Sequence, residues 1–269
     1  MEQPSLKGKA AIVTGSATGI GAATAIGLAA RGAHVAINYS RSAEAADETA
    51  EAAREAGAAH GVEIRVVQAN VADDSDCRKL VDAATDAWGR LDILVNNAGT
   101  TKFASHADLD ALSAEDFANI YAVNVIGPYQ MVRAAAPALK ASGDGAIVNV
   151  SSIAGVAGIG SSIAYAASKG ALNTLTLSLA RALAPEIRVN AVCPGYVATG
   201  WFKNRFGEEQ FEKITANAAE AAPLKRAADA EEIAHTVLFL AGPESRNITG
   251  EFVLTDSGMH LAVMAGARR

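Results

Sequence analysis

The chain has 269 residues, 50% of them hydrophobic, and a formal net charge of -6. This acidic balance argues against a nucleic-acid partner. The sequence shows neither a basic, apolar leader nor an apolar run of about eighteen residues, which argues against secretion and membrane spanning. Cys77 and Cys193 give no disulfide framework and no metal-ligand spacing, so we expect a cytoplasmic protein without a bound metal.

Short apolar runs alternate with alanine-rich helical stretches, and the length suits one domain, residues 1–269. The pattern predicts strands at residues 10–14, 33–38, 62–69, 91–95, 145–151, 187–193 and 251–255. Helices are predicted at residues 20–31, 43–56, 73–88, 113–140, 163–183 and 229–241. This alternation predicts an α/β fold with a doubly wound, seven-stranded parallel sheet and helices on both faces. Ligands would bind beyond the carboxyl ends of the strands.

The first predicted strand runs into a glycine-rich turn, Gly15-Ser16-Ala17-Thr18-Gly19-Ile20-Gly21, and then into a helix. Glycine lets the backbone approach a pyrophosphate closely, and a helix N-terminus favours the negative charge. The spacing is G-x-x-x-G-x-G instead of the more familiar G-x-G-x-x-G. Three glycines alone also mark a tight turn, but a strand before and a helix after favour a dinucleotide site.

The end of the second predicted strand reads Asn38-Tyr39-Ser40-Arg41-Ser42. Dinucleotide sites that select NAD place an acidic residue here, whereas a positive charge suits the 2'-phosphate of NADP. No acid precedes Glu44, and Arg41 can bind a phosphate through two hydrogen bonds. This segment therefore favours NADP, with NAD as the other possibility. The alternative is that Arg41 only caps a solvated loop.

Tyr165 and Lys169 stand four residues apart in a predicted helix, so their side chains share one face. A free phenol has a pKa of roughly 10, and a neighbouring ammonium would favour its ionised form. Ser152 follows the predicted strand 145–151, at the edge where a hydroxyl can face a ligand. Taken alone, such a pair is usually a packed ring beside a solvated lysine. Together with the glycine turn, it indicates acid-base chemistry.

Several motifs follow one another along the chain: Thr14 to Gly21, Asn96-Asn97-Ala98-Gly99, Asn124, Ser152, Tyr165, Lys169 and Pro194-Gly195. In the order and spacing of these motifs, the chain resembles the classical short-chain dehydrogenase/reductase family, from about Leu6 to about His260. It looks most similar to the 3-oxoacyl-carrier-protein reductase and glucose dehydrogenase-like branch. The resemblance implies a single Rossmann domain and a dinucleotide-dependent oxidoreductase.

The resemblance implies catalytic roles for Asn124, Ser152, Tyr165 and Lys169. Ser152 would bond the substrate oxygen, and Tyr165 would exchange the proton as hydride moves. Lys169 would favour the ionised phenol and bind cofactor ribose, and Asn124 would help to relay protons. Ser151 competes with Ser152, but in a strand it faces the opposite side.

The resemblance also implies a set of cofactor-binding residues. Asn70 stands where the family usually has an aspartate on the adenine, and its amide oxygen can still accept that hydrogen bond. Alternatively, Asn96 and Asn97 only form a turn. The expected set is Gly15, Ser16, Thr18, Gly19, Ile20, Gly21, Tyr39, Ser40, Arg41, Asn70, Val71, Asn97, Ala98, Gly99, Tyr165, Lys169, Pro194, Gly195, Val197 and Thr199.

Aromatic residues gather where the family has its substrate lid, at about residues 198–222: they are Trp201, Phe202, Phe206 and Phe211. A helix here could present an apolar face to a substrate. Equally, these rings could pack onto the body of the protein or onto a neighbouring subunit.

We therefore expect an NADP(H)-preferring oxidoreductase that moves a hydride between nicotinamide and a small or apolar carbonyl or secondary alcohol. The alternative is a non-catalytic, dinucleotide-sensing regulator of the same fold. Such relatives lose the tyrosine or the lysine, which this chain keeps. The leucine-rich stretch 164–184 carries more apolar surface than one buried stripe needs, and the resemblance implies pairing of this helix. A homotetramer is expected, with a dimer as the alternative.

Overall fold

A computed structural model describes residues 6–261, so both ends of the predicted domain, 1–5 and 262–269, lie outside the described residues. Within them, one parallel sheet of seven strands has the order β3-β2-β1-β4-β5-β6-β7. The strands are β1 Ala10–Val13, β2 His34–Tyr39, β3 Ile64–Gln68, β4 Ile93–Asn96, β5 Gly145–Val150, β6 Ile187–Pro194 and β7 Phe252–Thr255. The predicted sheet and its helical layers are confirmed.

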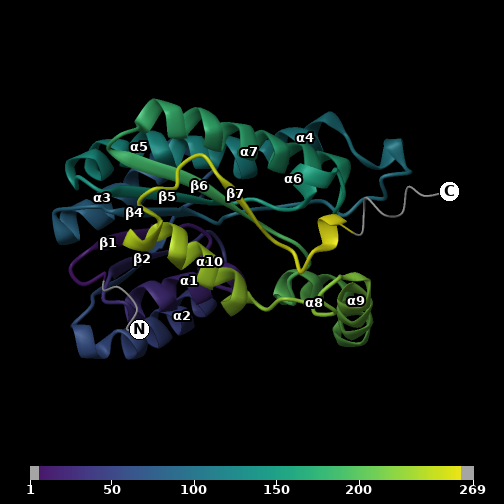
Figure 1. Ribbon diagram of the computed structural model, residues 1–269, viewed down its shortest axis with the longest axis horizontal. Coiled ribbons are helices and arrows are strands. Elements are labelled where there is room, and N and C mark those ends of the chain that lie inside the picture. The colour runs from purple at the N-terminus through teal and green to yellow at the C-terminus, as the bar shows by residue number, and fades with distance from the viewer. Residues whose placement is uncertain (1–5, 262–269) are drawn as a thin grey trace.

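Helices cover both faces of this sheet, as Figure 1 shows. On one face lie α1 Gly19–Ala30, α2 Ala43–Ala56 and α10 Ala230–Ala241, and on the other lie α3 Asp74–Trp88, α5 Gly127–Ala141 and α7 Ile163–Leu183. Further helices lie toward the carboxyl ends of the strands: α4 Ala114–Tyr121, α6 Ala154–Ala157, α8 Gly200–Phe206 and α9 Glu208–Ala221. Over residues 6–261, no helix is long and apolar enough to cross a membrane.

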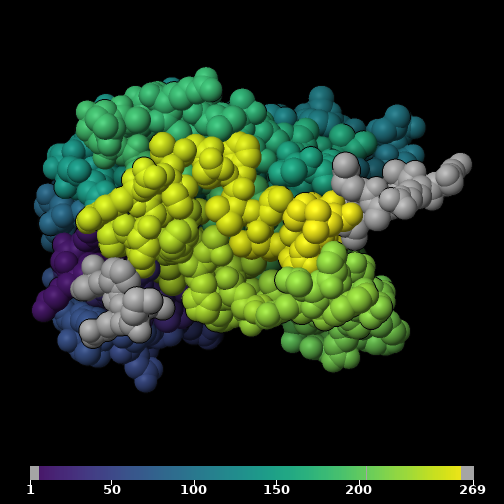
Figure 2. All heavy atoms as spheres, in the orientation of Figure 1, coloured from purple at the N-terminus to yellow at the C-terminus, as the bar shows by residue number. Residues whose placement is uncertain are grey.

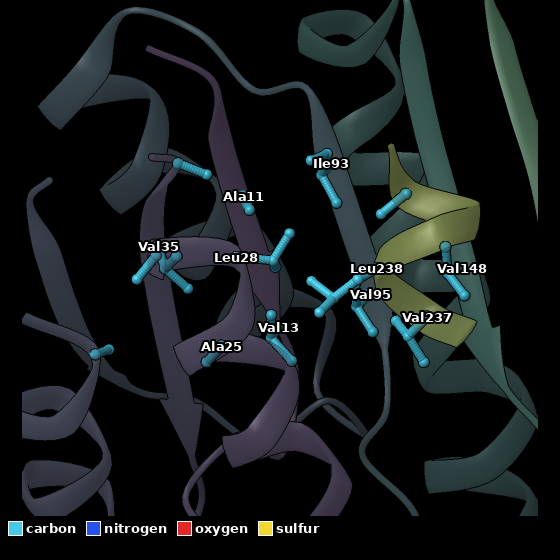
Figure 3. Close-up of a cluster of buried hydrophobic side chains, with 14 of the residues drawn as sticks. Ala11, Val13, Ala25, Leu28, Val35, Ile93, Val95, Val148, Val237 and Leu238 are labelled. Atoms are coloured by element: carbon cyan, nitrogen blue, oxygen red, sulfur yellow. The ribbon is translucent and has the colours of Figure 1, made fainter. Parts of the chain in front are cut away.

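The apolar runs are nearly continuous because both faces of each central strand are buried. Val13 points to one face, where it joins a cluster with Leu28 of α1 and Val237 of α10 (Figure 3). Its neighbour Ile12 points to the opposite face and packs in the cluster that includes Met131 of α5. All these side chains are fully buried, and each such burial contributes about 1.5–3 kcal/mol.

The predicted helix 113–140 is wrong in one respect. It is interrupted by a π-helical segment, Ala122–Ile126, which separates α4 from α5 and contains Asn124. The predicted helix start at residue 113 agrees with the structure, because Ser113 and Asp116 form a capping box at the N-terminus of α4. One extra residue in a turn barely changes the apolar periodicity, so the sequence pattern does not show it.

The predicted lid segment forms two helices instead of one. α8 and α9 are separated at Gly207, whose φ of 78° is one that glycine adopts readily. Figure 2 shows this green lid projecting from the body beside the yellow segment that follows β7. The chain after the lid is tied to that segment, because the Leu224 amide donates to the carbonyl of Ser257 over 3.1 Å. The lid thus lies at the edge where the strands end.

Candidate active site

The glycine turn after β1 has no room for a side chain at Gly15 or at Gly21. Gly15 has a φ of 61°, and a Cβ there would lie 2.8 Å from the Cα of Ala98. A Cβ on Gly21 would overlap the side-chain amide of Asn97 and lie 2.5 Å from the carbonyl oxygen of Gly15. The turn after β1 and the turn after β4 are therefore in direct backbone contact.

Hydrogen bonds lock these two turns together. The Asn97 side chain donates to the carbonyls of Thr14 and Gly15 over 3.0 and 2.9 Å. The Thr14 hydroxyl accepts from the amides of Asn97 and Ala98, each over 3.0 Å. Asn97 is therefore more than a turn residue, because it fixes the shape of the glycine turn.

The side chain of Ser16 is hydrogen-bonded within the turn. Its hydroxyl donates to the Val13 carbonyl over 2.6 Å and accepts from the Asn38 amide over 2.9 Å, and its own amide donates to the Asn38 carbonyl. The side chain is fully buried. The hydroxyl of Ser16 therefore supports the turn from inside.

The start of α1 suits a pyrophosphate. Thr18 is the N-cap residue, it is exposed, and its side chain makes no capping hydrogen bond. The first amides of the helix, at Gly19, Ile20 and Gly21, therefore point toward an open edge with the favourable end of the helix dipole. Thr199 lies close by, since a Cβ on Gly19 would be 3.7 Å from its methyl group. Together with the close backbone packing at Gly15 and Gly21, this arrangement fits a dinucleotide.

The end of β2 is open to solvent. Tyr39 is half-buried, whereas Ser40 and Arg41 are exposed. Within residues 6–261, Arg41 makes no hydrogen bond or ion pair, so nothing supports the alternative that it caps the loop. Its guanidinium can turn toward a phosphate at this edge.

The expected adenine-binding region follows β3. Asn70 is exposed, and its side-chain oxygen already accepts from the Ala72 amide over 3.2 Å. One lone pair remains for an adenine amino group. Val71 is buried against Gly127, where a Cβ would lie 2.9 Å from the Val71 side chain. Val71 therefore shapes this region through packing, while its neighbour Asn70 has the polar contact to offer.

Ser152 and Tyr165 come together, as the sequence predicts. Ser152 follows β5, and α7 begins at Ser162, whose hydroxyl accepts from the Tyr165 amide over 3.2 Å. Burial raises the pKa of Tyr165 to about 12, while hydrogen bonding with Ser152 acts in the opposite direction. The Ser151 hydroxyl points away from Tyr165 and donates to the side-chain oxygen of Asn173 over 2.6 Å.

Lys169 is buried one turn along the same helix. Its ammonium lies 5.7 Å from the centre of the Tyr165 ring and donates to the carbonyl of Val150 over 2.8 Å. Burial lowers the pKa of Lys169 to about 8. The sequence predicts that Lys169 favours the ionised phenol, but in this structure burial is the larger effect on the pKa of Tyr165.

Asn124 reaches the same place from the π-helical segment. Its side-chain oxygen accepts from the Thr100 amide over 2.8 Å, and its amide group donates to the Thr100 carbonyl and to the Ser168 hydroxyl, each over 3.0 Å. Gly99 lies between Asn124 and Lys169, because a Cβ there would be 3.6 Å from the former and 3.8 Å from the latter. Insertions of this kind are frequent at functional sites, where they redirect a side chain.

The segment after β6 closes the site. Gly195 packs on Asp256, whose Cα would lie 2.8 Å from an added Cβ. The Ile153 amide donates to the Pro194 carbonyl over 2.9 Å, which connects this segment to the loop that contains Ser152. Val197 is buried, and its backbone forms a bridge with Ala228.

Lid rings lie directly beside the catalytic candidates. Trp201 has its ring centre 6.4 Å from that of Tyr165. Phe202 lies 4.7 Å from Tyr196 and 6.0 Å from Phe103, again between ring centres. These rings therefore pack against the body of the same chain, at the site itself.

Sequence reasoning missed four residues that shape this site. Thr14 and Asn38 hold the glycine turn, with the Asn38 side chain accepting from the Gly15 amide over 3.0 Å. Ser168 positions Asn124, and Phe103 supports the lid. Thr14 and Asn38 stand in segments noted in the sequence, although the sequence does not show their contacts. The others follow from contacts between segments far apart in the chain.

Comparisons with known proteins agree with this geometry. A family model described as Enoyl-(Acyl carrier protein) reductase matches residues 15–260. The putative ketoacyl reductase 2 of the granaticin polyketide synthase from Streptomyces violaceoruber is 43% identical over 251 residues, with 93% of this chain and 96% of that protein covered. A 3-oxoacyl-(acyl-carrier-protein) reductase from Staphylococcus aureus is 34% identical over 257 residues, with 94% and 98% covered.

A solved structure gives the same result. The crystal structure of a putative short-chain dehydrogenase/reductase from Burkholderia xenovorans matches with a TM-score of 0.85 and 42% identity, and the match covers 97% of this chain and 100% of that one. The family resemblance inferred from the motifs is thereby confirmed. The chain belongs to the short-chain dehydrogenase/reductase family, in a branch like the 3-oxoacyl-carrier-protein reductases, and is an oxidoreductase that uses a nicotinamide dinucleotide.

Proposed function

We propose that this chain is an NADP(H)-preferring reductase of small or apolar ketones, or in reverse a dehydrogenase of the corresponding secondary alcohols. The observation that carries the proposal is the meeting of Tyr165, Ser152 and Lys169 beside the glycine turn, under an apolar lid. The cofactor would supply or accept the hydride. The protein's own residues would orient the substrate and exchange the proton.

The proton chemistry follows from the environment of Tyr165. Because burial raises its pKa to about 12, the phenol is protonated near neutral pH and can donate to a carbonyl oxygen. Ser152 would hold that oxygen in reach of the phenol. The pKa of Lys169 is about 8, so the side chain is mostly cationic at neutral pH and would favour the phenolate left behind. Asn124, held by three hydrogen bonds, would fix the position of the backbone around Lys169.

The regulator alternative has no observation in its favour. All four catalytic candidates are present, Asn124 and Lys169 lie next to Gly99, and the Lys169 ammonium is 5.7 Å from the centre of the Tyr165 ring. Coenzyme oxidation, followed by absorbance across ketones, quinones, sugars and acyl thioesters, tests the proposal. The absence of turnover with the whole panel, in protein that binds the coenzyme, would count for the regulator instead.

Coenzyme selectivity is expected to depend on Arg41. NADP carries one more phosphate than NAD, and the Arg41 guanidinium is exposed and without a partner within residues 6–261. One charge-assisted hydrogen bond contributes about 1.5–3 kcal/mol, which corresponds to a preference of roughly ten- to a hundredfold. Arg41→Ala should therefore weaken the binding of NADPH by about that factor and leave the binding of NADH nearly unchanged. Dissociation constants from titration of both coenzymes measure this.

Arg65→Ala is a suitable control, because Arg65 of β3 is also an exposed arginine but pairs with Glu63, which precedes the strand. It should change neither dissociation constant. Equal losses for the two coenzymes in Arg41→Ala, or tighter NADH binding in the wild type, would refute the NADP assignment.

We also propose that the chain forms a homotetramer, with a dimer as the alternative. Leu172 and Leu179 of α7 are buried within the chain, but Leu177 is 39% exposed, and Ile126 and Tyr129 at the start of α5 are 49% and 47% exposed. Apolar surface on these neighbouring helices favours self-association. Light scattering at micromolar concentration should give the mass of four chains of 27.5 kDa. A monomer mass would contradict both assemblies.

The compartment proposed for the protein is the cytoplasm. Cys77 and Cys193 are both free and buried. Such thiols suit a reducing environment.

A further inference from the structure

Six aromatic side chains from four separate segments meet at the lid. They are Phe103 after β4, Tyr165 of α7, Tyr196 after β6, and Trp201, Phe202 and Phe206 of α8. The rings meet mostly edge to face or tilted, which is how aromatic side chains pack favourably. They fall into an inner group that holds the lid and an outer group that remains accessible.

The inner group is structural. Phe202 is half-buried between Phe103 and Tyr196, at 6.0 and 4.7 Å between ring centres. The Tyr196 hydroxyl is hydrogen-bonded to Thr215 of α9 over 2.7 Å, so the second lid helix is held by the same group. These contacts fix α8 on the body, with Trp201 of the same helix beside Tyr165.

Trp201 belongs to the outer group. Its ring centre is 6.4 Å from that of Tyr165, with the two planes at 54°. The side chain is 40% exposed, and within residues 6–261 no other aromatic ring contacts it. The indole therefore lies beside the catalytic phenol with much of its surface uncovered. Phe206 is exposed to a similar extent, 39%, while its ring meets Phe103 at 5.3 Å.

Two lysines near this cluster are already paired, whereas Arg205 of α8 is exposed and makes no ion pair within residues 6–261. Lys102, next to Phe103, bonds Asp116 over 2.7 Å, and Lys203 of α8 bonds Glu208 over 2.6 Å. On α6, close behind Ser152, Val156 is 52% exposed and adds an aliphatic surface. The Trp201 ring beside the phenol and the aliphatic Val156 thus favour a flat, apolar group on the substrate.

From this we infer that the substrate carries its carbonyl directly on an aromatic or fused-ring group, and that Trp201 selects this group by stacking on it. The inference rests on the proposed ketone reductase function. A bound reduced nicotinamide would supply the hydride for the new C–H bond at the carbonyl carbon, and Tyr165 would give the proton that completes the alcohol. The aryl group takes no part in bond making. It only holds the carbonyl in reach of Tyr165 and Ser152.

Two ketones of equal carbon number provide the test: acetophenone, with an aryl group, and 2-octanone, with a flexible chain. The expected kcat/KM of the wild type with NADPH is at least about tenfold higher for acetophenone, because ring stacking adds to apolar burial. Trp201→Ala should bring the ratio close to one, mainly by lowering the acetophenone value. Trp201→Phe should keep most of the preference, since it keeps a ring.

A binding measurement separates selection from turnover. The chain has 2 tryptophans, so Trp88→Phe leaves Trp201 as its single indole. Trp88 lies on α3 and stacks on His34, 5.5 Å away, and Trp88→Phe should not change kcat/KM for either ketone. In this variant, acetophenone should quench the Trp201 fluorescence saturably, and 2-octanone should not.

The outcomes distinguish this inference from the proposed function. Equal kcat/KM for the two ketones, or a preference that survives in Trp201→Ala, would overturn the aryl selection and leave the reductase in place. If neither ketone is reduced but acetophenone quenches saturably, the aryl site stands and the ketone reductase fails. No turnover and no saturable quenching would overturn both. Unchanged NADPH binding in Trp201→Ala would show that the variant is folded.

Discussion

Tyr165→Phe should lower the turnover of ketone reduction by at least about a hundredfold, the usual scale for a positioned acid-base group. The substitution removes only the hydroxyl, so the ring keeps its place beside Trp201 and above Lys169. Affinity for the dinucleotide should stay nearly the same, because the glycine turn and α1 are untouched. Steady-state rates and coenzyme titration of the purified variant measure the two quantities separately.

Tyr129→Phe is a matched control, since it removes a phenol hydroxyl from an exposed position on α5. It should retain wild-type turnover. Turnover that persists in Tyr165→Phe would mean that the phenol is not the proton donor.

The pH profile provides a second check on the same residue. Because burial raises the pKa of Tyr165 to about 12, the protonated form needed for reduction dominates across neutral pH, and that rate should be nearly level there. Alcohol oxidation needs the phenolate, so its rate should rise with pH toward that value. The rise should disappear in Tyr165→Phe.

The sequence predicts the fold well because the sheet is buried on both faces. Each central strand is then a short, continuous apolar run, which stands out from the helices around it. The interruption around Asn124 does not appear in the sequence, because apolar spacing is almost the same with and without it. The division of the lid at Gly207 is hidden for a related reason: most α9 side chains are exposed, so their pattern is weak.

The candidate site divides in the same way. Residues that act through sequence spacing, such as Tyr165 and Lys169, can be found from the chain alone. Asn38 cannot, because its hydrogen bond to the Gly15 amide depends on two strands lying side by side. The effect of burial on the pKa of Tyr165 is also invisible in the sequence, since it depends on how the surrounding chain covers the ring.

Gly21→Ala should weaken the binding of both coenzymes to a similar extent. The backbone of Gly21 is helical, so alanine suits its conformation, and the effect is steric. The added methyl would overlap the Asn97 amide and lie 2.5 Å from the Gly15 carbonyl oxygen, and both groups are held by hydrogen bonds. Overpacking of this kind costs about 1–3 kcal/mol. If the turn moves to relieve it, dissociation constants should rise roughly five- to 150-fold.

Gly27→Ala in the same helix separates affinity from stability. Its methyl would meet the flexible end of Leu238 in the core, far from the glycine turn, so it should lower the melting temperature and leave both dissociation constants unchanged. In Gly21→Ala, NADPH and NADH should weaken by similar factors, because the two share the pyrophosphate that the turn and the start of α1 would bind. A loss of affinity confined to NADPH would mean that the turn binds the 2'-phosphate instead. Unchanged dissociation constants for both coenzymes would mean that the pyrophosphate does not bind at this turn.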